Sequence, residues 1–209
     1  MPARLRTSPR KTPRQRRAQA TIDAILDAAA RILIREGYAR ATTNRVAVVA
    51  GVSIGTLYQY FPSKDAVVAA LVERHIGRMR ALLAARVAEV AGAPVPEFVR
   101  AMVTALFAAH AVDPDLHRTI LEHVPLVERA PHLLALQREM HAVVAAALAA
   151  RGGLRRDDVA LAAVVACEAV TAVAHAALFD ADLAARRTAL VEEVVDLVAR
   201  YLTADATQA

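Results

Sequence analysis

Apolar residues recur along this chain with the three- and four-residue spacing of amphipathic α-helices. From Arg16 onward, Ile22, Ile25, Ala29 and Ile32 follow this period, which predicts a helix that ends at Gly37. The sequence shows no alternation of the kind typical of β-strands, so we expect an all-α fold. Glycine, proline and aspartate breaks place the later helices at about 43–50, 54–60, 64–91, 96–111, 114–124, 127–150, 157–178 and 183–203.

Gly77 lies near the middle of the long helix expected at 64–91. An ordinary helix former at this position would be worth about 1 kcal/mol more. One explanation is packing, with a neighbour too close for any Cβ atom, and the other is a hinge. We favour packing.

Two of the expected helices are short, and only Gly51, Val52 and Ser53 separate them. Two short helices joined by a tight turn that contains glycine are typical of a helix-turn-helix, whose second helix enters the major groove of DNA. Gly51 permits the sharp turn, and Ser53 can cap the second helix.

Charge is distributed unevenly along the chain. Residues 1–64 carry twelve Lys or Arg and three Asp or Glu, hence +9, whereas residues 65–209 carry a net −4. A polyanion is the expected partner of the basic end. A basic tail alone is weak evidence, because such tails can also be merely solvated, bind RNA or touch acidic lipid. The helix-turn-helix that follows it favours double-stranded DNA.

The second short helix carries the residues expected to read DNA bases. Gly55 removes a side chain where this helix must approach DNA closely. Ile54 and Thr56 offer methyl groups to thymine methyls, and Gln59 offers an amide to an adenine edge.

Tyrosines and a lysine in the same region are expected to contact phosphates. Tyr58 and Tyr60 each combine a rigid apolar ring with one hydroxyl, and Lys64 lies at the start of the following helix. The alternative is that the two tyrosines only cover the small core of this region. Leu57 and Phe61 are expected to point into that core.

Between Ala24 and Leu71 the chain carries a helix ending in EGY, a TT pair, an AGVS turn, the segment GTLYQYF, and PSK at the start of the next helix. This block resembles the DNA-binding domain of the TetR family of transcriptional regulators. The chain departs from the family pattern at Val48 and Val49, where a polar or charged pair is common.

The resemblance implies an all-α homodimer, with three DNA-binding helices and a larger helical domain in each subunit. It also implies that the larger domain binds an effector and dimerises through its last two helices, here 157–178 and 183–203. By resemblance, the DNA contacts fall on Thr43, Val52, Ser53, Ile54, Gly55, Thr56, Tyr58, Gln59, Tyr60 and Lys64.

We therefore expect four parts: a flexible basic arm at 1–15, a helix-turn-helix DNA-binding domain at 16–76 with its motif at about 42–61, a helical ligand-binding and dimerisation domain at 77–203, and a tail at 204–209. The leading hypothesis is a ligand-responsive repressor that a small apolar effector releases from a palindromic operator. The alternatives are a sequence-tolerant architectural DNA-binding protein and a regulator with no small-molecule effector.

An effector of this kind would occupy an apolar cavity that holds a few polar groups. Each candidate lining residue has ordinary core packing as its alternative role. The candidates are Phe98, Met102, Phe107, His110, His117, Met140 and Cys167.

Neither a metal site nor a cofactor is predicted. Consecutive histidines among His110, His117, His123, His132 and His141 are six to nine residues apart, so no neighbouring pair shares one helical turn. An enzyme is not predicted either, because the sequence lacks a Gly-rich phosphate loop, a G-x-S-x-G motif and a metal triad.

Cys167 is the only cysteine, so an internal disulfide is impossible, and a cytoplasmic location is expected. The N-terminal residues lack the apolar segment of a signal peptide. Glu168, Thr171 and His175 interrupt the most apolar stretch, which therefore predicts a buried helix rather than a membrane span. These three residues share one helix face and could line a pocket, meet a dimer partner or face water.

Overall fold

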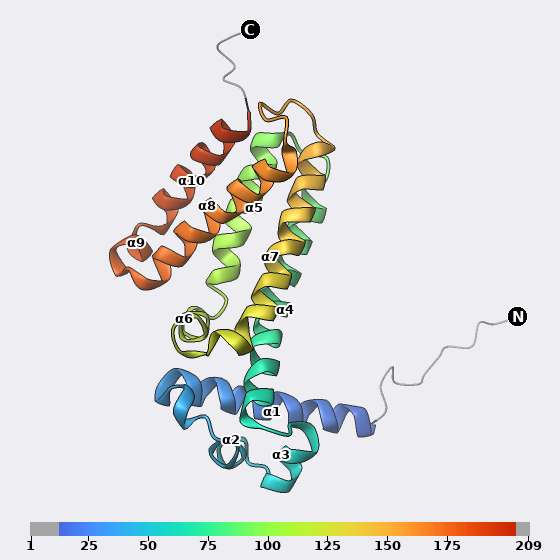
Figure 1. The fold of residues 1–209 in the computed structure, drawn as a ribbon, viewed down its shortest axis with the longest axis vertical. Helices are drawn as coiled ribbons and strands as arrows, with labels where there is room; N and C mark the ends of the chain where they lie inside the picture. The colour runs from blue at the N-terminus through green and yellow to red at the C-terminus, as the bar shows by residue number, and fades with distance from the viewer. Residues whose placement is uncertain (1–12, 204–209) are drawn as a thin grey trace, which may run out of the picture. The chain divides into compact units, whose positions relative to one another are not determined.

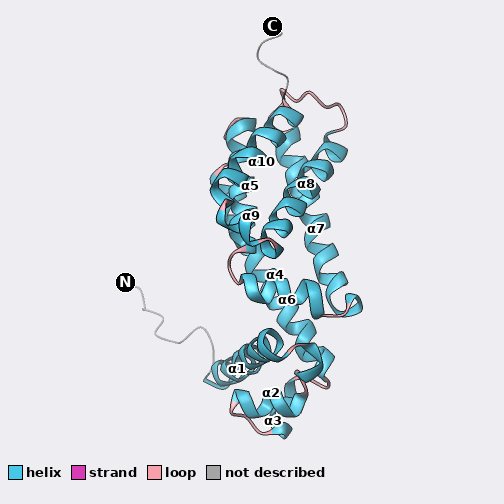
Figure 2. Cartoon of the chain, turned by 90° about the vertical axis from the view of Figure 1, so that its left-hand side faces the viewer, coloured by secondary structure: helices cyan, strands magenta, loops and turns pink. Residues whose placement is uncertain are grey.

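The computed structural model describes residues 13–203, except for the side chains of residues 13, 14 and 126–132. In this range the chain forms ten α-helices and no strand, which confirms the expected all-α fold (Figures 1 and 2). The first helix begins at Pro13, inside the segment expected to be a flexible arm, because proline is favoured in the first turn of a helix. Residues 1–12 of that arm, and the tail expected at 204–209, lie outside the described residues.

The chain divides into two compact units between Leu71 and Val72, near the boundary expected at residue 76. Helix α4 (Lys64–Glu89) contains the division, so its first turns belong to the N-terminal unit and the remainder to the C-terminal unit.

The N-terminal unit builds one small core. It contains α1 (Pro13–Glu36), the 3-10 turn η1 (Tyr38–Arg40), α2 (Thr43–Ala50), α3 (Ile54–Tyr60) and the start of α4. Its core is apolar throughout, and Leu57 and Phe61 are buried in it as expected. The two short helices of the predicted helix-turn-helix have the expected bounds, because the signals that start and stop them are local in the sequence.

The C-terminal unit is a bundle of helices, five of which pack against α8. After α4 come α5 (Val95–His110), α6 (Pro114–His123), α7 (Leu126–Ala149), α8 (Val159–Phe179), α9 (Ala181–Ala185) and α10 (Arg187–Leu202). Helix α8 packs against α5, α6, α7, α9 and α10, and Figure 1 shows α5, α7, α8 and α10 side by side. The core combines Phe98, Phe107 and Leu148 with many alanines and valines.

The last helix, expected as one element over 183–203, is broken at Arg186. The backbone N–H of Arg186 closes α9 by donating to the carbonyls of Asp182 and Leu183, and its own carbonyl accepts from Leu190 at the start of α10. The Asp180 side chain caps α9 by accepting from the N–H groups of Asp182 and Leu183. The sequence therefore predicted one helix where the structure has two.

Arg151, just after α7, fastens one end of the C-terminal unit. Its guanidinium donates to the carbonyls of Val90, Ala91 and Ala93, which follow α4, and to the carbonyl of Ala147 in α7. The same group lies over the Phe98 ring, 4.2 Å from its centroid. One side chain thus satisfies backbone acceptors at the ends of two helices.

Helix α8 is only partly covered within the chain, whereas the sequence predicted a buried helix. Among the described residues, α8 alone is long and apolar enough to cross a membrane by itself, and α5 with α6 would qualify only as a bent pair. Of the most apolar 18-residue stretch of α8, 28 % is buried. Ala163, Ala166 and Val170 are buried, while Leu161 and Val165 are exposed.

Gly77 is exposed on α4, and a Cβ atom built there meets nothing within 4 Å. The packing explanation for this glycine is therefore wrong. Gly51, by contrast, has a φ of 69°, in the left-handed region where a side chain is strained.

Opposite effects on stability are expected from replacing these two glycines by alanine. Gly77→Ala should raise the free energy of unfolding by about 1 kcal/mol, because alanine is the better helix former. Gly51→Ala should lower it by about 1–2 kcal/mol, because alanine must adopt the left-handed conformation. Urea unfolding followed by circular dichroism measures both, and a destabilised Gly77→Ala protein would contradict the structure.

Candidate nucleic-acid interface and ligand cavity

Hydroxyl caps hold the two helices of the motif in the N-terminal unit. The Thr42 hydroxyl accepts from the N–H of Arg45 at 3.3 Å, and the Ser53 hydroxyl accepts from the N–H of Thr56 at 3.0 Å. Gly51 ends α2 in the left-handed conformation. The turn therefore has the geometry that the sequence predicted.

One face of α3 is open to solvent. Ile54, Gly55, Tyr58 and Gln59 are exposed along it. A Cβ atom built at Gly55 would meet only the Ser53 hydroxyl oxygen, at 3.8 Å, so this part of the helix is open to a close approach. Val52 and Tyr60, which were also expected to contact DNA, are half-buried.

Thr56 is half-buried, and its hydroxyl oxygen lies 2.8 Å from that of Ser53. Thr56 was expected to contact a DNA base, and its hydroxyl is engaged with Ser53, the residue that caps the same helix.

A contact between Tyr58 and Thr43 joins α3 to the start of α2. Their hydroxyl oxygens are 3.2 Å apart, and Tyr58 is 52 % exposed. Both residues were expected to contact DNA, and they present neighbouring hydroxyls of the kind that binds phosphate.

Lys64 is held by Tyr38, a residue to which the sequence reasoning gave no role although it belongs to the EGY motif. The Lys64 ammonium lies 3.7 Å from the centroid of the Tyr38 ring and donates to the Tyr38 carbonyl at 3.3 Å. The Tyr38 hydroxyl donates to Asp65 at 2.7 Å.

Val48, where the chain departs from the family pattern, is 72 % exposed.

The C-terminal unit contains a cavity of about 390 Å³ with mostly apolar walls. Helices α4, α5, α7 and α8 contribute most of its lining, with Met79 and Leu83 among the residues from α4. The structure places six of the seven candidate residues in this lining: Phe98, Met102, His110, His117, Met140 and Cys167.

Phe107 lies outside the lining and is buried in the core. Phe98, Met102, Leu106 and His110 line the cavity at intervals of four, and Val99 and Val103 line it from the neighbouring stripe. Phe107 continues that second stripe but lies outside the lining. Spacing within α5 alone therefore does not separate Phe107 from the residues that line the cavity.

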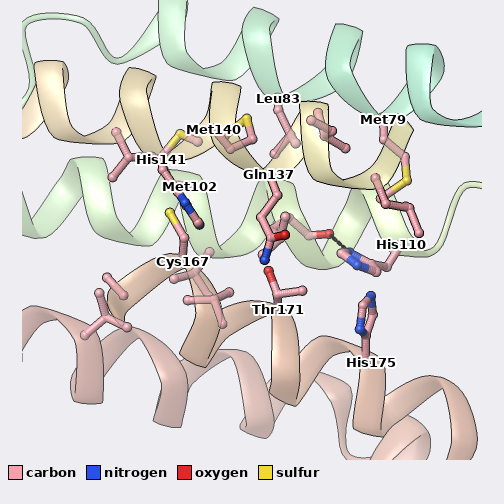
Figure 3. A pocket seen from close by; sticks show the side chains of 18 of the residues that line it. Met79, Leu83, Met102, His110, Gln137, Met140, His141, Cys167, Thr171 and His175 are labelled. Carbon is pink, nitrogen blue, oxygen red and sulfur yellow. Dashed lines mark hydrogen bonds between the residues drawn. The ribbon is translucent and has the colours of Figure 1, made fainter. Parts of the chain in front are cut away.

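Polar side chains occur at two places in the cavity wall (Figure 3). At one, Glu168 accepts hydrogen bonds from Gln137 and, at 2.9 Å, from Nε2 of His141. Thr171 and His175, on the same face of α8 as Glu168, line the cavity. Of the three roles left open for these residues, the structure thus gives Thr171 and His175 the pocket.

Cys167 also lines the cavity, and burial raises the pKa of its thiol to about 12. The thiol is therefore protonated at neutral pH and acts as a small apolar side chain.

Four histidines from four different helices meet at the other polar place. His75 of α4, His110 of α5 and His117 of α6 are buried, and His175 of α8 is half-buried. Nε2 of His75 lies 2.8 Å from Nδ1 of His117, and Nε2 of His117 lies 3.4 Å from Nε2 of His175. We call these four residues the histidine cluster.

Burial lowers the pKa of every member of the histidine cluster. The pKa falls to about 4 for His75 and His175 and to about 2 for His117, where neighbouring histidines add to the effect of burial. The pKa of His110 is also lowered, again chiefly by burial. All four imidazoles are therefore neutral at pH 7.

Sequence spacing did not reveal this cluster, because its members are brought together by helix packing rather than by one helical turn. His75 and His175 were absent from the histidines weighed as metal ligands. His123 is on α6 but exposed, and the side chain of His132 lies outside the described residues.

Two family models match the chain. Residues 25–71 match the model described as bacterial regulatory proteins of the tetR family, and residues 94–202 match the tetracyclin repressor-like C-terminal domain. The second match alone covers more than half of the chain.

Relatives in sequence match about a third of the chain. The uncharacterized HTH-type transcriptional regulator MT1294 of Mycobacterium tuberculosis is 37 % identical over 75 residues, which is 36 % of this chain and 37 % of that protein. The nucleoid occlusion factor SlmA of Haemophilus ducreyi is 42 % identical over 67 residues, or 32 % of this chain and 31 % of that protein. These matches span only about a third of each relative's length.

Similarity in structure extends over both units. The SmeT–triclosan complex is 25 % identical with a TM-score of 0.68, and the match covers 90 % of this chain and 94 % of that one.

Proposed function

The chain belongs to the TetR family of transcriptional regulators, and from this premise we propose that it is a repressor that leaves a palindromic operator when a small apolar molecule enters its cavity. The exposed face of α3 carries the DNA-binding part of the proposal. That face offers Gln59 to bases beside the paired hydroxyls of Tyr58 and Thr43, which suit phosphate oxygens.

Phosphate contacts fix the position of the protein on DNA, and base contacts give its sequence preference. Lys64, held over the Tyr38 ring, supplies a positive charge at the start of α4. The remaining contacts in this proposal are the other motif residues, namely Val52, Ser53, Ile54, Gly55, Thr56 and Tyr60.

Two copies are needed, because one short recognition helix specifies too few bases for an operator. The uncovered surface of α8 and α10 supports dimerisation there: Leu161 and Leu197 are 58 % and 57 % exposed, and Val165 and Phe179 are exposed too. A two-fold interface buries the same apolar patch on both subunits. A cytoplasmic location is part of the proposal, because the DNA that the dimer would bind is there.

The cavity supports an apolar effector. Its walls combine the aromatic ring of Phe98 with the flexible side chains of Met79, Met102 and Met140, which adapt to varied shapes. Triclosan occupies the related SmeT structure, and a compound of similar polarity is the class we propose here.

A sequence-tolerant architectural protein is the second candidate. The 42 % identity over 67 residues to a protein named as a nucleoid occlusion factor favours it. The cavity favours the regulator that responds to a ligand, because architectural binding needs no such site. A regulator without an effector is the third possibility.

Selection from random DNA duplexes distinguishes these candidates. The repressor should enrich one palindrome whose half-sites lie about one helical turn apart, or a little more, and prefer it about a thousandfold or more. An architectural protein would enrich no single sequence.

Variants of α3 test the assigned contacts on the selected palindrome. Tyr58→Phe removes only a hydroxyl and should weaken binding to all duplexes by about 1 kcal/mol, whereas Gln59→Ala should relax the preference at one base pair. Tyr201→Phe is the matched control, because Tyr201 lies beside Arg156 in the C-terminal unit. If Tyr58→Phe changed the preferred sequence at constant affinity, the two roles would be reversed.

Variants that narrow the cavity test whether the effector binds there. Triclosan and other small apolar compounds serve as probes, and an effector should release the palindrome in an anisotropy titration. Met102→Trp fills part of the cavity and should weaken the response at least about tenfold while DNA affinity is kept. Leu134→Trp, on the exposed side of α7, should respond as the unaltered protein does. Release that is insensitive to Met102→Trp would place the effector elsewhere.

Charged substitutions on the exposed apolar surface of α8 and α10 test whether the dimer forms there. Leu161→Glu and Leu197→Glu each place two like charges in a two-fold apolar interface, so both should give monomers at micromolar concentration. Leu82→Glu, at an equally apolar but separate exposed position on α4, should remain dimeric. Size-exclusion chromatography with light scattering reads the mass, and an unaltered protein that runs as a monomer would refute the interface.

A further inference from the structure

We propose that His110, His117 and His175 form a binding site for a transition-metal ion of the Zn²⁺ class, with His75 orienting His117. One ring nitrogen from each of the three lies within 4.8 Å of the other two, and all three side chains line the cavity. The site goes beyond the proposed regulation and depends on neither DNA nor an apolar effector.

The distance between two of the ligand atoms fits such an ion. Zn–N bonds of about 2.0–2.1 Å at a tetrahedral angle place two ligand nitrogens about 3.3–3.4 Å apart. Nε2 of His117 and Nε2 of His175 are 3.4 Å apart. This is longer than a normal hydrogen bond and longer than the 2.8 Å between His75 and His117. The two rings thus present one edge of a tetrahedral site.

His110 supplies the third nitrogen. Nδ1 of this ring lies 2.8 Å from the Leu106 carbonyl oxygen, and a carbonyl can only accept, so Nδ1 carries the proton. The lone pair of the neutral ring is then on Nε2. A hydrogen bond from the far ring nitrogen to a backbone carbonyl is the usual arrangement of a metal-binding histidine. One ring nitrogen of His110 lies within 4.8 Å of those of His117 and His175, so binding one ion requires the His110 side chain to move closer to them.

His75 has the place of an orienting group behind His117. When Nδ1 of His117 donates to Nε2 of His75, the lone pair of His117 is fixed on Nε2, which faces His175. His75 is buried, and its Nδ1 has no hydrogen-bond partner among the described residues. Burying a polar ring costs free energy unless the ring is hydrogen-bonded, and the hydrogen bond of His75 is the one to His117.

The donor set favours a first-row transition metal. Three neutral imidazoles suit Zn²⁺, Ni²⁺ or Cu²⁺, whereas Mg²⁺ and Ca²⁺ prefer oxygen ligands. Protons do not compete at neutral pH, because burial lowers the pKa of each ring. The carboxylates of Asp113 and Glu168 act on His75 and His175 respectively and would partly balance the charge of the ion.

Three ligands leave one tetrahedral position. Because all three ligands line the cavity, we assign that position to the cavity side. Water or an anionic donor atom of a small molecule can fill it. The cavity would then accept compounds that combine an apolar body with a metal-binding group.

Metal titration of the untagged full chain tests the site. Protein stripped with EDTA and dialysed is titrated with Zn²⁺ against a chromogenic chelator. One ion per chain with an apparent Kd below about 1 µM is expected, and Mg²⁺ should not compete. Co²⁺ should give the intense visible absorption of a tetrahedral complex. No Zn²⁺ uptake at 10 µM, or the weak spectrum of six-coordinate Co²⁺, would overturn the proposal.

Variants locate the ion. His117→Gln and His175→Gln each remove a ligand and should weaken Zn²⁺ binding about 100-fold or more, while His75→Gln should weaken it about 10–100-fold with one ion still bound. His123→Gln is the matched control, because His123 is on α6 with His117 but is exposed. Full affinity in the His175→Gln protein, or an equal loss in the His123→Gln protein, would refute the site. The Co²⁺ spectrum of the unaltered chain decides the question if a variant fails to fold.

Discussion

The C-terminal unit is organised by the need to cover α8, which is long and mostly apolar. Helix α8 packs against five other helices, and its small side chains at Ala163 and Ala166 allow close contact. Another face, with Cys167, Thr171 and His175, forms part of the cavity wall. A third face, with Leu161 and Val165, is left uncovered. Core, cavity and candidate dimer surface are therefore properties of one helix.

The N-terminal unit meets a different constraint, because α3 has only seven residues and is too short to be stable by itself. Its backbone depends on the cap from Ser53, and its position depends on the burial of Leu57 and Phe61. With these two side chains turned inward, the opposite face of the helix is left to solvent. Presentation of Tyr58 and Gln59 thus follows from how the small core is filled.

Sequence reasoning succeeded where the physical signal is local. Gly51 ends the first motif helix by its backbone conformation and Ser53 starts the second by capping, so these bounds could be predicted. It was less successful for the cavity, where Phe107 was a candidate by residue type but lies in the core, outside the lining. The histidine cluster could not be predicted, because the packing of α4, α5, α6 and α8 creates it.

The Arg151 contacts also bear on the order in which the chain folds. They join the end of α7 to carbonyls about sixty residues earlier, so the loop they close includes α5, α6 and α7. Closing so long a loop costs chain entropy that only an already collapsed segment can offset. During synthesis from the N-terminus, the carbonyls after α4 must bond water until Arg151 emerges. This end of the unit is therefore completed late, and a fragment that stops before Arg151 would leave it unfinished.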